Sequence, residues 1–333
     1  MEHITLQTSK ITQLGHAVLE GARLNREEAL FLLEADEQQR YELFYWANYI
    51  RIRCLGPEVT LCAIASARTA GCTEDCRFCA QSRHYHTHIT PQTAAAEQLI
   101  AAAQNAKNKG AHSFGIVASG RRLTDDAMDR YRPVISAIIN DIGIGCCASL
   151  GCLTDEQAQQ LFEMGVRRYN HNLETSENYF PKVVTTHSYA ERIDTVRAVQ
   201  KAGMEVCCGG IIGMGESKQD RVDLALKLRD LDVDMVPMNF LHPIAGTPFA
   251  DLPVLAPMEA LQTIAMFRFV LPDKQIKMAG GREKCLRDLQ SWMFFAGASA
   301  TIIGNYLTTT GRAAEDDLQM LADLGMKWEK KDL

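Results

Sequence analysis

Three cysteines, Cys72, Cys76 and Cys79, stand in the segment GCTEDCRFCAQS with the spacing C-x3-C-x2-C. Three thiolates on one short loop can give a four-iron cluster three protein ligands and leave its fourth iron open to a molecule that is not protein. A structural zinc site, which would need a fourth Cys or His, and a coincidence in a cysteine-rich chain are the alternatives. The spacing therefore predicts an iron–sulfur centre with one open coordination position.

The composition narrows the classes of protein to consider. The chain has 333 residues, 11 of them cysteine, and a formal net charge of -6. The negative charge gives no electrostatic reason to expect binding to nucleic acid or to an anionic membrane. The first residues lack the basic start and apolar run of a signal peptide, and no apolar stretch is long enough for a transmembrane helix. We therefore expect a cytoplasmic protein whose cysteines bind metal or catalyse.

Short apolar runs that alternate with helical stretches must position the cysteine loop. Runs that are apolar almost throughout are typical of parallel strands buried on both faces. Eight such strand–helix units in a chain of 333 residues predict a closed (β/α)8 barrel of the TIM type. An open doubly wound sheet is the alternative. The runs begin at Val59, His112, Ile142, Val166, Met204, Val233, Gln275 and Ala300.

The chain has no composition shift that would divide it. No Pro/Ser-rich linker, charge block or repeat of fixed period interrupts the sequence, so we predict one domain over residues 1–333. Helices are expected over about 1–50 and the barrel over about 55–325. Asn25 and Glu28 are spaced as a capping box in the N-terminal part. Further helices are expected from Thr90 and Pro91 to Gly110 and from Ser188 to about Ala202.

The order of several motifs resembles the biotin synthase family of radical S-adenosylmethionine (SAM) enzymes. The resemblance runs from about Leu61 to Leu324. Its motifs are GCTEDCRFCAQS, with Phe78 before the last cysteine, YNHNLET from Tyr169, TTHSYAERIDT from Thr185, VCCGGIIGMGE from Val206, VPMNFLHPIAGTPF from Val236 and MAGGRE from Met278.

The resemblance implies a complete reaction as well as the barrel fold. In this superfamily the open iron binds the amino and carboxylate groups of SAM, and an electron from the cluster cleaves SAM to a 5′-deoxyadenosyl radical. The family uses two SAM molecules to convert dethiobiotin to biotin. It also implies an electron donor such as flavodoxin or ferredoxin, and a homodimer.

The resemblance assigns SAM-binding roles to residues in and after the fourth and fifth runs. Gly209, Ile211, Gly213 and Glu216 form a GxIxGxxE pattern that would lie along the adenine. Asn172 and Glu174, two residues apart at a strand end, would both face the barrel opening and reach the ribose. Arg192 would bind the SAM carboxylate through its guanidinium. Read without the resemblance, Asn172 and Glu174 could be a capping pair, and Arg192 a solvated helix residue paired with Glu191 or Asp194.

The resemblance also assigns residues to the substrate. Asn172 and Asn239 would bind the ureido group, since an amide offers both a donor and an acceptor. Thr309 and Thr310 in the segment LTTTG would hold the substrate carboxylate. In the bare sequence they are an ordinary polar loop.

One part of the family pattern is broken. The best-known members hold a second, 2Fe-2S cluster through three cysteines and an arginine, and its sulfur enters the product. Two of these cysteines match Cys147 and Cys207. The third position is Gly115, and the arginine position is Lys277. The usual four-ligand site therefore cannot form.

Another cysteine is needed to complete a second centre. Because side chains alternate along a strand, Cys146 and Cys208 should face the outer helices when their neighbours face the barrel interior. Cys62 on the first run is the best replacement, and Cys152 is second. With Cys62, Cys147 and Cys207 as ligands, the chain resembles members that lack the arginine. We predict a four-iron auxiliary cluster with an extra sulfide, with Lys277 close by as a cation that is not a ligand.

Two other readings of the chain stay open. It could be a radical SAM relative acting on another substrate, in another sulfur insertion or a cofactor maturation, or it could be a non-catalytic iron–sulfur or zinc protein. The histidines of RHYHTH, His84, His86 and His88, are expected in a solvated loop and not at a metal. Cys54 and Cys285 are expected to be structural thiols.

Overall fold

The structure, a computed structural model, describes residues 8–328. The ends of the predicted domain, 1–7 and 329–333, lie outside the described residues, and so does most of the opening segment that argued against a signal peptide. The chain forms a parallel barrel that closes where β10 (Ala300–Ile302) pairs with β1 (Thr60–Thr69). This confirms the predicted (β/α)8 fold and excludes the open sheet.

The remaining barrel strands follow the predicted runs in order. They are β3 (Ser113–Ala118), β4 (Gly145–Ser149), β5 (Arg168–Asn170), β6 (Glu205–Cys207) with β7 (Gly210–Ile212), β8 (Met235–Phe240) and β9 (Gln275–Met278).

The fifth predicted run is two strands instead of one. Both β6 and β7 pair with β8, and the chain between them is Cys208–Gly209. A Cβ atom on Gly209 would lie only 2.1 Å from the carbonyl oxygen of Pro237, so only glycine fits where this break approaches β8. The break therefore depends on close backbone packing, which hydrophobic periodicity does not reveal.

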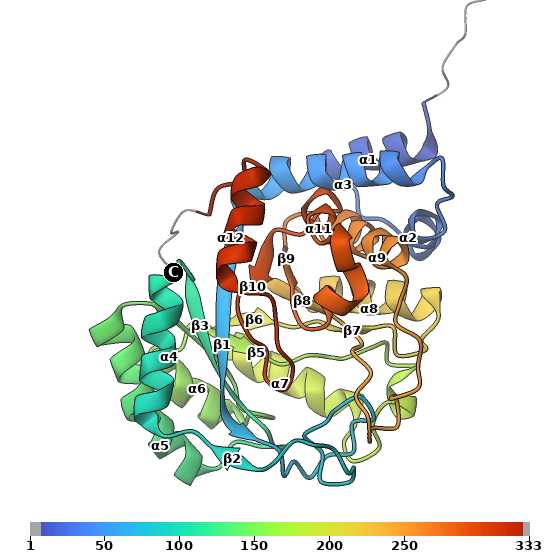
Figure 1. The fold of residues 1–333 in the computed structure, drawn as a ribbon. Helices are drawn as coiled ribbons and strands as arrows, with labels where there is room; N and C mark the ends of the chain where they lie inside the picture. Colours follow the sequence, from blue (N-terminus) through green and yellow to red (C-terminus); the bar gives the residue numbers. More distant parts are fainter. Residues whose placement is uncertain (1–7, 329–333) are drawn as a thin grey trace, which may run out of the picture.

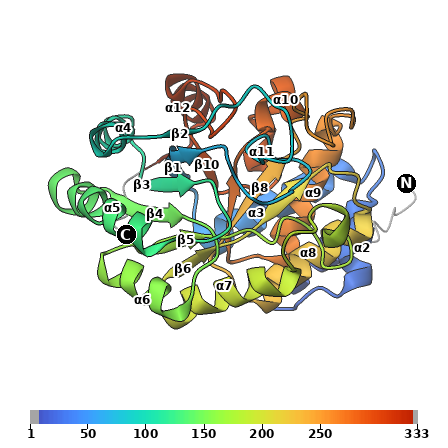
Figure 2. The same ribbon diagram turned by 90° about the horizontal axis from the view of Figure 1, so that it is seen from below.

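Helices surround the barrel on all sides (Figure 2). They are α4 (Ala96–Asn108), α5 (Asp125–Ser136) with its π-helical extension Ala137–Ile142, α6 (Asp155–Glu163), α7 (Tyr189–Lys201), α8 (Lys218–Asp230), α9 (Pro257–Val270), α10 (Arg282–Leu286), α11 (Trp292–Phe295) and α12 (Ala314–Asp323), with single 3-10 turns at Phe180–Lys182 and Arg287–Leu289.

The predicted helix ends were partly right. Ser188 caps α7 as expected, because its hydroxyl accepts a hydrogen bond from the backbone N–H of Glu191. The predicted start at Thr90 and Pro91 was wrong. A short strand, β2 (Gln92–Thr93), follows them and pairs antiparallel with β1, so α4 begins only at Ala96.

Three N-terminal helices, α1 (Lys10–Leu19), α2 (Arg26–Leu33) and α3 (Arg40–Leu55), precede the barrel. The capping box of Asn25 and Glu28 is present, with its two hydrogen bonds at 3.0 and 2.9 Å. Figure 1 shows α1 and α3 across the end of the barrel from which β1 starts, while β1 points to the opposite end, where the loops gather. Among residues 8–328 no helix has both the length and the apolar character needed to cross a membrane.

Candidate active site

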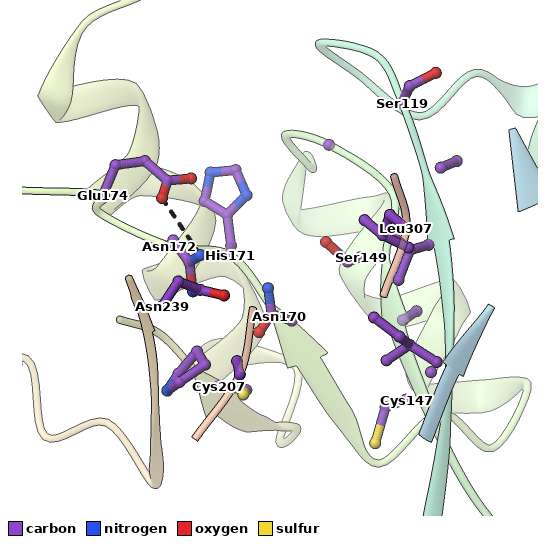
Figure 3. Close-up of a pocket in the computed structure, with 18 of the residues that line it drawn as sticks. Ser119, Cys147, Ser149, Asn170, His171, Asn172, Glu174, Cys207, Asn239 and Leu307 are labelled. Carbon is purple, nitrogen blue, oxygen red and sulfur yellow. Dashed lines mark hydrogen bonds between the residues drawn. The ribbon is translucent and has the colours of Figure 1, made fainter. Parts of the chain in front are cut away.

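A pocket of about 320 Å³ opens at the carboxyl ends of the barrel strands and extends into the barrel. It is the position at which TIM barrels carry their active sites. The cysteine loop and several interior strand residues line the same pocket, part of which is drawn in Figure 3. The lining includes the predicted residues Cys62, Cys72, Cys76, Phe78, Cys79, Cys147, Cys152, Asn172, Glu174, Arg192, Cys207, Asn239 and Lys277.

The cysteine loop is shaped by its own backbone. The N–H of Cys72 bonds to the carbonyl of Gln81 at 3.0 Å, and the carbonyl of Cys72 accepts from the N–H of Arg83 at 2.9 Å. Burial raises the pKa of the Cys76 thiol, and it raises the pKa of Cys79 to about 11. These thiols are therefore protonated at neutral pH until a metal displaces the protons.

The donor set on this loop fits a four-iron cluster better than a single ion. Over residues 8–328 no three His, Cys, Asp or Glu side chains are arranged to hold one metal ion. In a four-iron cluster each cysteine binds a separate iron, so the sulfurs do not have to converge on one point. Cys72, Cys76 and Cys79 meet the weaker requirement, because they come from one loop and face one pocket.

Arg192 belongs to the site and not to the solvated face of α7. It is only 9% exposed. Its Nη1 donates to the carbonyl of Asn172 at 2.8 Å and lies 3.7 Å from a carboxylate oxygen of Glu174. Glu191, one of the partners expected in the solvated reading, pairs instead with Arg121 at 2.7 Å. That reading of Arg192 is therefore wrong.

Two residues that the sequence reasoning missed hold this arginine. The Nε of Arg192 donates to Nε2 of His187 at 3.1 Å, and Nδ1 of His187 lies 2.5 Å from a carboxylate oxygen of Glu74. Burial, together with the charge of Arg192, lowers the pKa of His187, so the ring is neutral and donates to Glu74 through Nδ1. Glu74 lies in the motif GCTEDCRFCAQS and His187 in the motif TTHSYAERIDT. A titratable side chain inside each of these motifs was the signal that the sequence offered.

Asn172 and Glu174 face each other across the pocket, with Nδ2 of Asn172 3.4 Å from a carboxylate oxygen of Glu174 (Figure 3). The expected reason for their placement was wrong. Strand β5 ends at Asn170, and Glu174 has a φ of 69°, so a left-handed turn and not strand alternation turns its side chain inward. Burial raises the pKa of Glu174.

Backbone groups on both sides fix the side-chain amide of Asn239, which lines the pocket. Its Nδ2 donates to the carbonyl of Gly210 at 3.2 Å, and its Oδ1 accepts from the N–H of Gly280 at 3.0 Å. Asn172 is fixed in a similar way, since its Oδ1 accepts from the N–H of Gly209 at 3.2 Å. Both amides are thus fixed in orientation before any ligand binds.

His171, also missed, is buried between these residues. It lines the pocket and is 8% exposed, and its Nε2 has no hydrogen-bond partner among the described residues. Burial lowers the pKa of this imidazole well below its ordinary value. The ring is therefore a neutral side chain beside Asn172 (Figure 3).

The GxIxGxxE residues lie beside the pocket and do not form its lining. Ile211 packs with Phe78 against a small apolar cluster of Val183, Met214, Leu241 and Phe249. Glu216 accepts from the backbone N–H groups of Gly213 at 2.9 Å and Met214 at 2.7 Å, and it forms a buried ion pair with Arg221 at 2.7 Å. The carboxylate of Glu216 therefore fixes the turn after β7.

Thr309 and Thr310 lie in the loop after β10 and are not part of the pocket lining. Thr310 is exposed, and the backbone carbonyl of Thr309 accepts from the N–H of Tyr306. The residue of this loop that lines the pocket is Leu307 (Figure 3).

The deep part of the pocket contains the second set of thiols. Cys62, Cys147 and Cys207 all line it. The hydroxyl of Ser113 lies 3.4 Å from the sulfur of Cys62, and Nζ of Lys277 lies 3.2 Å from the sulfur of Cys207. Burial opposes the charge of Lys277, but the neighbouring thiols outweigh burial and raise the pKa of its ammonium group.

The alternation predicted for the paired cysteines is confirmed. Cys146 and Cys208 are buried in the main hydrophobic core, outside the pocket that Cys147 and Cys207 line. Gly115 faces the same space as Cys147, because a Cβ atom there would lie 3.9 Å from the Cβ of Cys147 and 3.1 Å from a methyl group of Ile64.

Arg168 is the most prominent residue of the deep pocket that the sequence reasoning missed. It is 7% exposed, and its Nε and Nη2 both contact one carboxylate oxygen of Glu205, at 2.7 and 2.5 Å. Its Nη1 is buried and makes no hydrogen bond to a described residue. Two-residue alternation backward from Asn170 on β5 would have placed it inside the barrel.

The remaining expectations concern residues away from the pocket. His84 contacts the carbonyl of Thr73 at 2.9 Å, and none of His84, His86 and His88 belongs to the pocket lining. Cys285 is buried as expected, but Cys54 is exposed, so the expectation of a packed structural thiol was wrong there.

Comparisons with known proteins agree with this geometry. Residues 67–228 match the radical SAM superfamily, and residues 237–327 match the Biotin and Thiamin Synthesis associated domain. The biotin synthase of Carboxydothermus hydrogenoformans is 47% identical over 322 residues, which cover 96% of this chain and 99% of that protein. The biotin synthase of Geotalea daltonii is 48% identical over 318 residues, which cover 95% and 97%.

Solved structures show the same fold at low identity. A methylornithine synthase is 19% identical with a TM-score of 0.85, and the match covers 95% of this chain and 97% of that one. The FeFe-hydrogenase maturase HydG from Carboxydothermus hydrogenoformans is 18% identical with a TM-score of 0.81, over 95% and 78%.

Proposed function

The chain belongs to the biotin synthase family, and from this premise we propose how its own residues divide the reaction. It is a radical SAM sulfurtransferase that inserts sulfur into dethiobiotin and uses a 4Fe-4S cluster and SAM. The observation that carries our assignment is that the cysteine loop, the amides of Asn172 and Asn239 and the deep thiols all line one pocket.

Cys72, Cys76 and Cys79 would hold the 4Fe-4S cluster at the loop after β1. With the cluster and SAM bound, the site would supply a 5′-deoxyadenosyl radical that takes a hydrogen atom from an unactivated carbon. Two C–H bonds must be broken to close the new ring, so two SAM molecules are used. The protein positions these groups and excludes water around them.

The SAM molecule would be held by residues whose orientation is already fixed. Arg192 uses Nε and Nη1 for His187 and Asn172, and we assign its Nη2 to the SAM carboxylate. Glu174 and Asn172 would bind the ribose hydroxyls. The adenine would lie along Gly209, Ile211, Gly213 and Glu216, with Phe78 and Ile211 as an apolar contact and the backbone of the turn as polar contact.

The substrate would occupy the pocket between the cysteine loop and the deep thiols. Asn239 and Asn172 present fixed amides that suit the ureido group, which has both donors and acceptors. Thr309 and Thr310 would bind the substrate carboxylate from the loop after β10, and Leu307 brings that loop to the pocket.

The second centre would be a four-iron cluster with an extra sulfide, held by Cys62, Cys147 and Cys207. These three sulfurs line the deep pocket, whereas Gly115 supplies no ligand. Lys277 supports the anionic centre as a cation and not as a ligand, with its ammonium group 3.2 Å from the sulfur of Cys207.

Anaerobic reconstitution, followed by iron and sulfide counting and a single-turnover assay with dethiobiotin, tests this assignment. We expect iron for two four-iron clusters, sulfide in excess of iron, and biotin as the product. Iron for one cubane only would overturn the second centre. Release of 5′-deoxyadenosine without biotin would favour a relative acting on another substrate.

The cellular location, the oligomeric state and the electron donor of the enzyme are proposed on the resemblance alone. We assign it to the cytoplasm as a homodimer, and we assign a low-potential donor such as flavodoxin or ferredoxin to its cluster. Size-exclusion chromatography with light scattering tests the dimer, and reduction of the cluster by each donor tests the electron source.

A further inference from the structure

Arg168, which is buried, differs from the fully buried Arg268 and Arg282 in having an unused donor. Arg268 places Nε on the carbonyl of Gly297, Nη2 on the hydroxyl of Ser299 and Nη1 on three backbone carbonyls. In Arg282 all three nitrogens likewise have partners. Arg168 is bound only on the side of Glu205, and its buried Nη1 has no partner among the described residues. A buried unsatisfied donor is costly, so it indicates a missing acceptor.

The missing acceptor belongs in the deep pocket. On the barrel interior Arg168 stands in register with Cys147 on one side and with Glu205 on the other. Cys207 follows Glu205 by two residues and faces the same interior, and Arg168, Cys147 and Cys207 all line the pocket. Arg168, whose Nη1 has no partner among the described residues, therefore lines the same pocket as the proposed second centre.

The charge of this region also requires an anion. Arg168 and Lys277 bring two buried cations into the deep pocket, and Glu205 balances one of them. Buried cations are stable only when they are paired. Sulfur anions can supply the balance, and Lys277 already contacts the sulfur of Cys207.

We propose that Arg168 is an anion-binding residue, and that its free Nη1 binds the extra sulfide of the second centre. This inference rests on the proposed auxiliary cluster and adds the protein group that would hold the transferable sulfur. Glu205 fixes the guanidinium from behind through Nε and Nη2. The donor that remains, Nη1, would then be available to the sulfide.

The test compares the neutral variants Arg168→Met and Arg168→Gln with the charged variant Arg168→Lys. Arg167→Met is the matched control, because Arg167 is the neighbouring residue on the chain, is exposed, and packs over the ring of Phe162. Each protein is reconstituted anaerobically with isotopically labelled sodium sulfide. Iron and sulfide per chain are counted by native mass spectrometry, and label in biotin is measured after one turnover.

We expect the neutral variants to keep the iron of both clusters and to lose one sulfide per chain, with labelled biotin at least tenfold below the unmodified protein. Arg168→Lys should retain part of the sulfide, and Arg167→Met all of it. Full retention of the sulfide in either neutral variant would overturn the inference and leave the second centre intact. Loss of the second-centre iron together with the sulfide would also overturn it, since Arg168 would then support assembly. An unmodified protein with one cubane only would refute the auxiliary cluster itself.

Discussion

The ammonium group of Lys277 on β9 lies 3.2 Å from the sulfur of Cys207 on β6, and strand β8 separates the two strands in the sheet. The contact therefore reaches past β8 on the interior face of the barrel. Lys277 occupies the position at which the family pattern has an arginine ligand. The contact places its cation beside the Cys207 thiol, so a lysine at this position can act as a charge partner.

Replacing Lys277 by Met should leave the iron of both clusters in place and reduce sulfur transfer. In the proposed second centre Lys277 would contribute charge and not a metal bond, so the three thiols should still bind iron, whereas the anionic centre would lose a buried partner. Iron counting and single-turnover biotin formation measure the two effects separately. Loss of the second-centre iron in Lys277→Met would contradict this role and make the lysine a ligand.

Replacing Cys62 by Ala should remove the second centre and spare the first. Cys62 lies on β1 and lines the deep pocket, whereas Cys72, Cys76 and Cys79 lie on the loop after β1. We expect about half of the iron, continued SAM cleavage and no biotin. Cys146→Ala is the matched control, since Cys146 packs into the core and should keep all iron. Full iron content and normal biotin formation in Cys62→Ala would remove Cys62 from the site.

Replacing Arg192 by Met should weaken SAM binding. The variant loses a charge-assisted contact of about 1.5–3 kcal/mol, which corresponds to a rise in Kd of roughly 10- to 150-fold. Arg197→Met on the same helix is the control, because Arg197 is exposed. Isothermal titration calorimetry under anaerobic conditions measures both. Equal Kd values for the two variants would show that Arg192 only supports the fold.

Replacing His187 by Asn should weaken SAM binding less than loss of the arginine itself. His187 touches Arg192 and Glu74, and it acts by holding the guanidinium in place. We expect a higher KM for SAM at nearly constant kcat. A fall in kcat with unchanged KM would show that His187 acts on the reaction and not on the orientation of Arg192.

Replacing Arg221 by Met should destabilise the barrel. Glu216 would then be a buried carboxylate without its ion-pair partner, which costs about 3–5 kcal/mol. For a chain of this size the thermal midpoint falls by roughly 1–2 °C for each kcal/mol. Lys201→Met removes the exposed pair with Asp155 and should leave the thermal midpoint nearly unchanged. Equal midpoints for the two variants would contradict the structural role of Glu216.

The barrel and the sides on which its thiols lie could be predicted because each depends on a short-range pattern. Apolar runs indicate buried strands, and the two-residue period separates Cys147 from Cys146. The split of β6 from β7 could not be predicted, because it depends on the approach of Gly209 to the Pro237 carbonyl from another strand.

The site residues also divide into those that sequence motifs indicate and those that they do not. Asn172, Glu174 and Asn239 stand in motifs that the sequence singles out, and all three line the pocket. The support of Arg192 by His187 and Glu74 joins segments more than a hundred residues apart, so no local pattern contains it. Arg168 was missed because an arginine inside a barrel strand conflicts with the expected apolar interior.

Helices α1 and α3 lie across the end of the barrel from which β1 starts, and the pocket opens at the opposite end (Figure 1). If two SAM molecules are used for each product, as we propose, both would be exchanged through this opening. The products of the first SAM would then leave past the cysteine loop before the second SAM binds, while the substrate lies between that loop and the deep thiols.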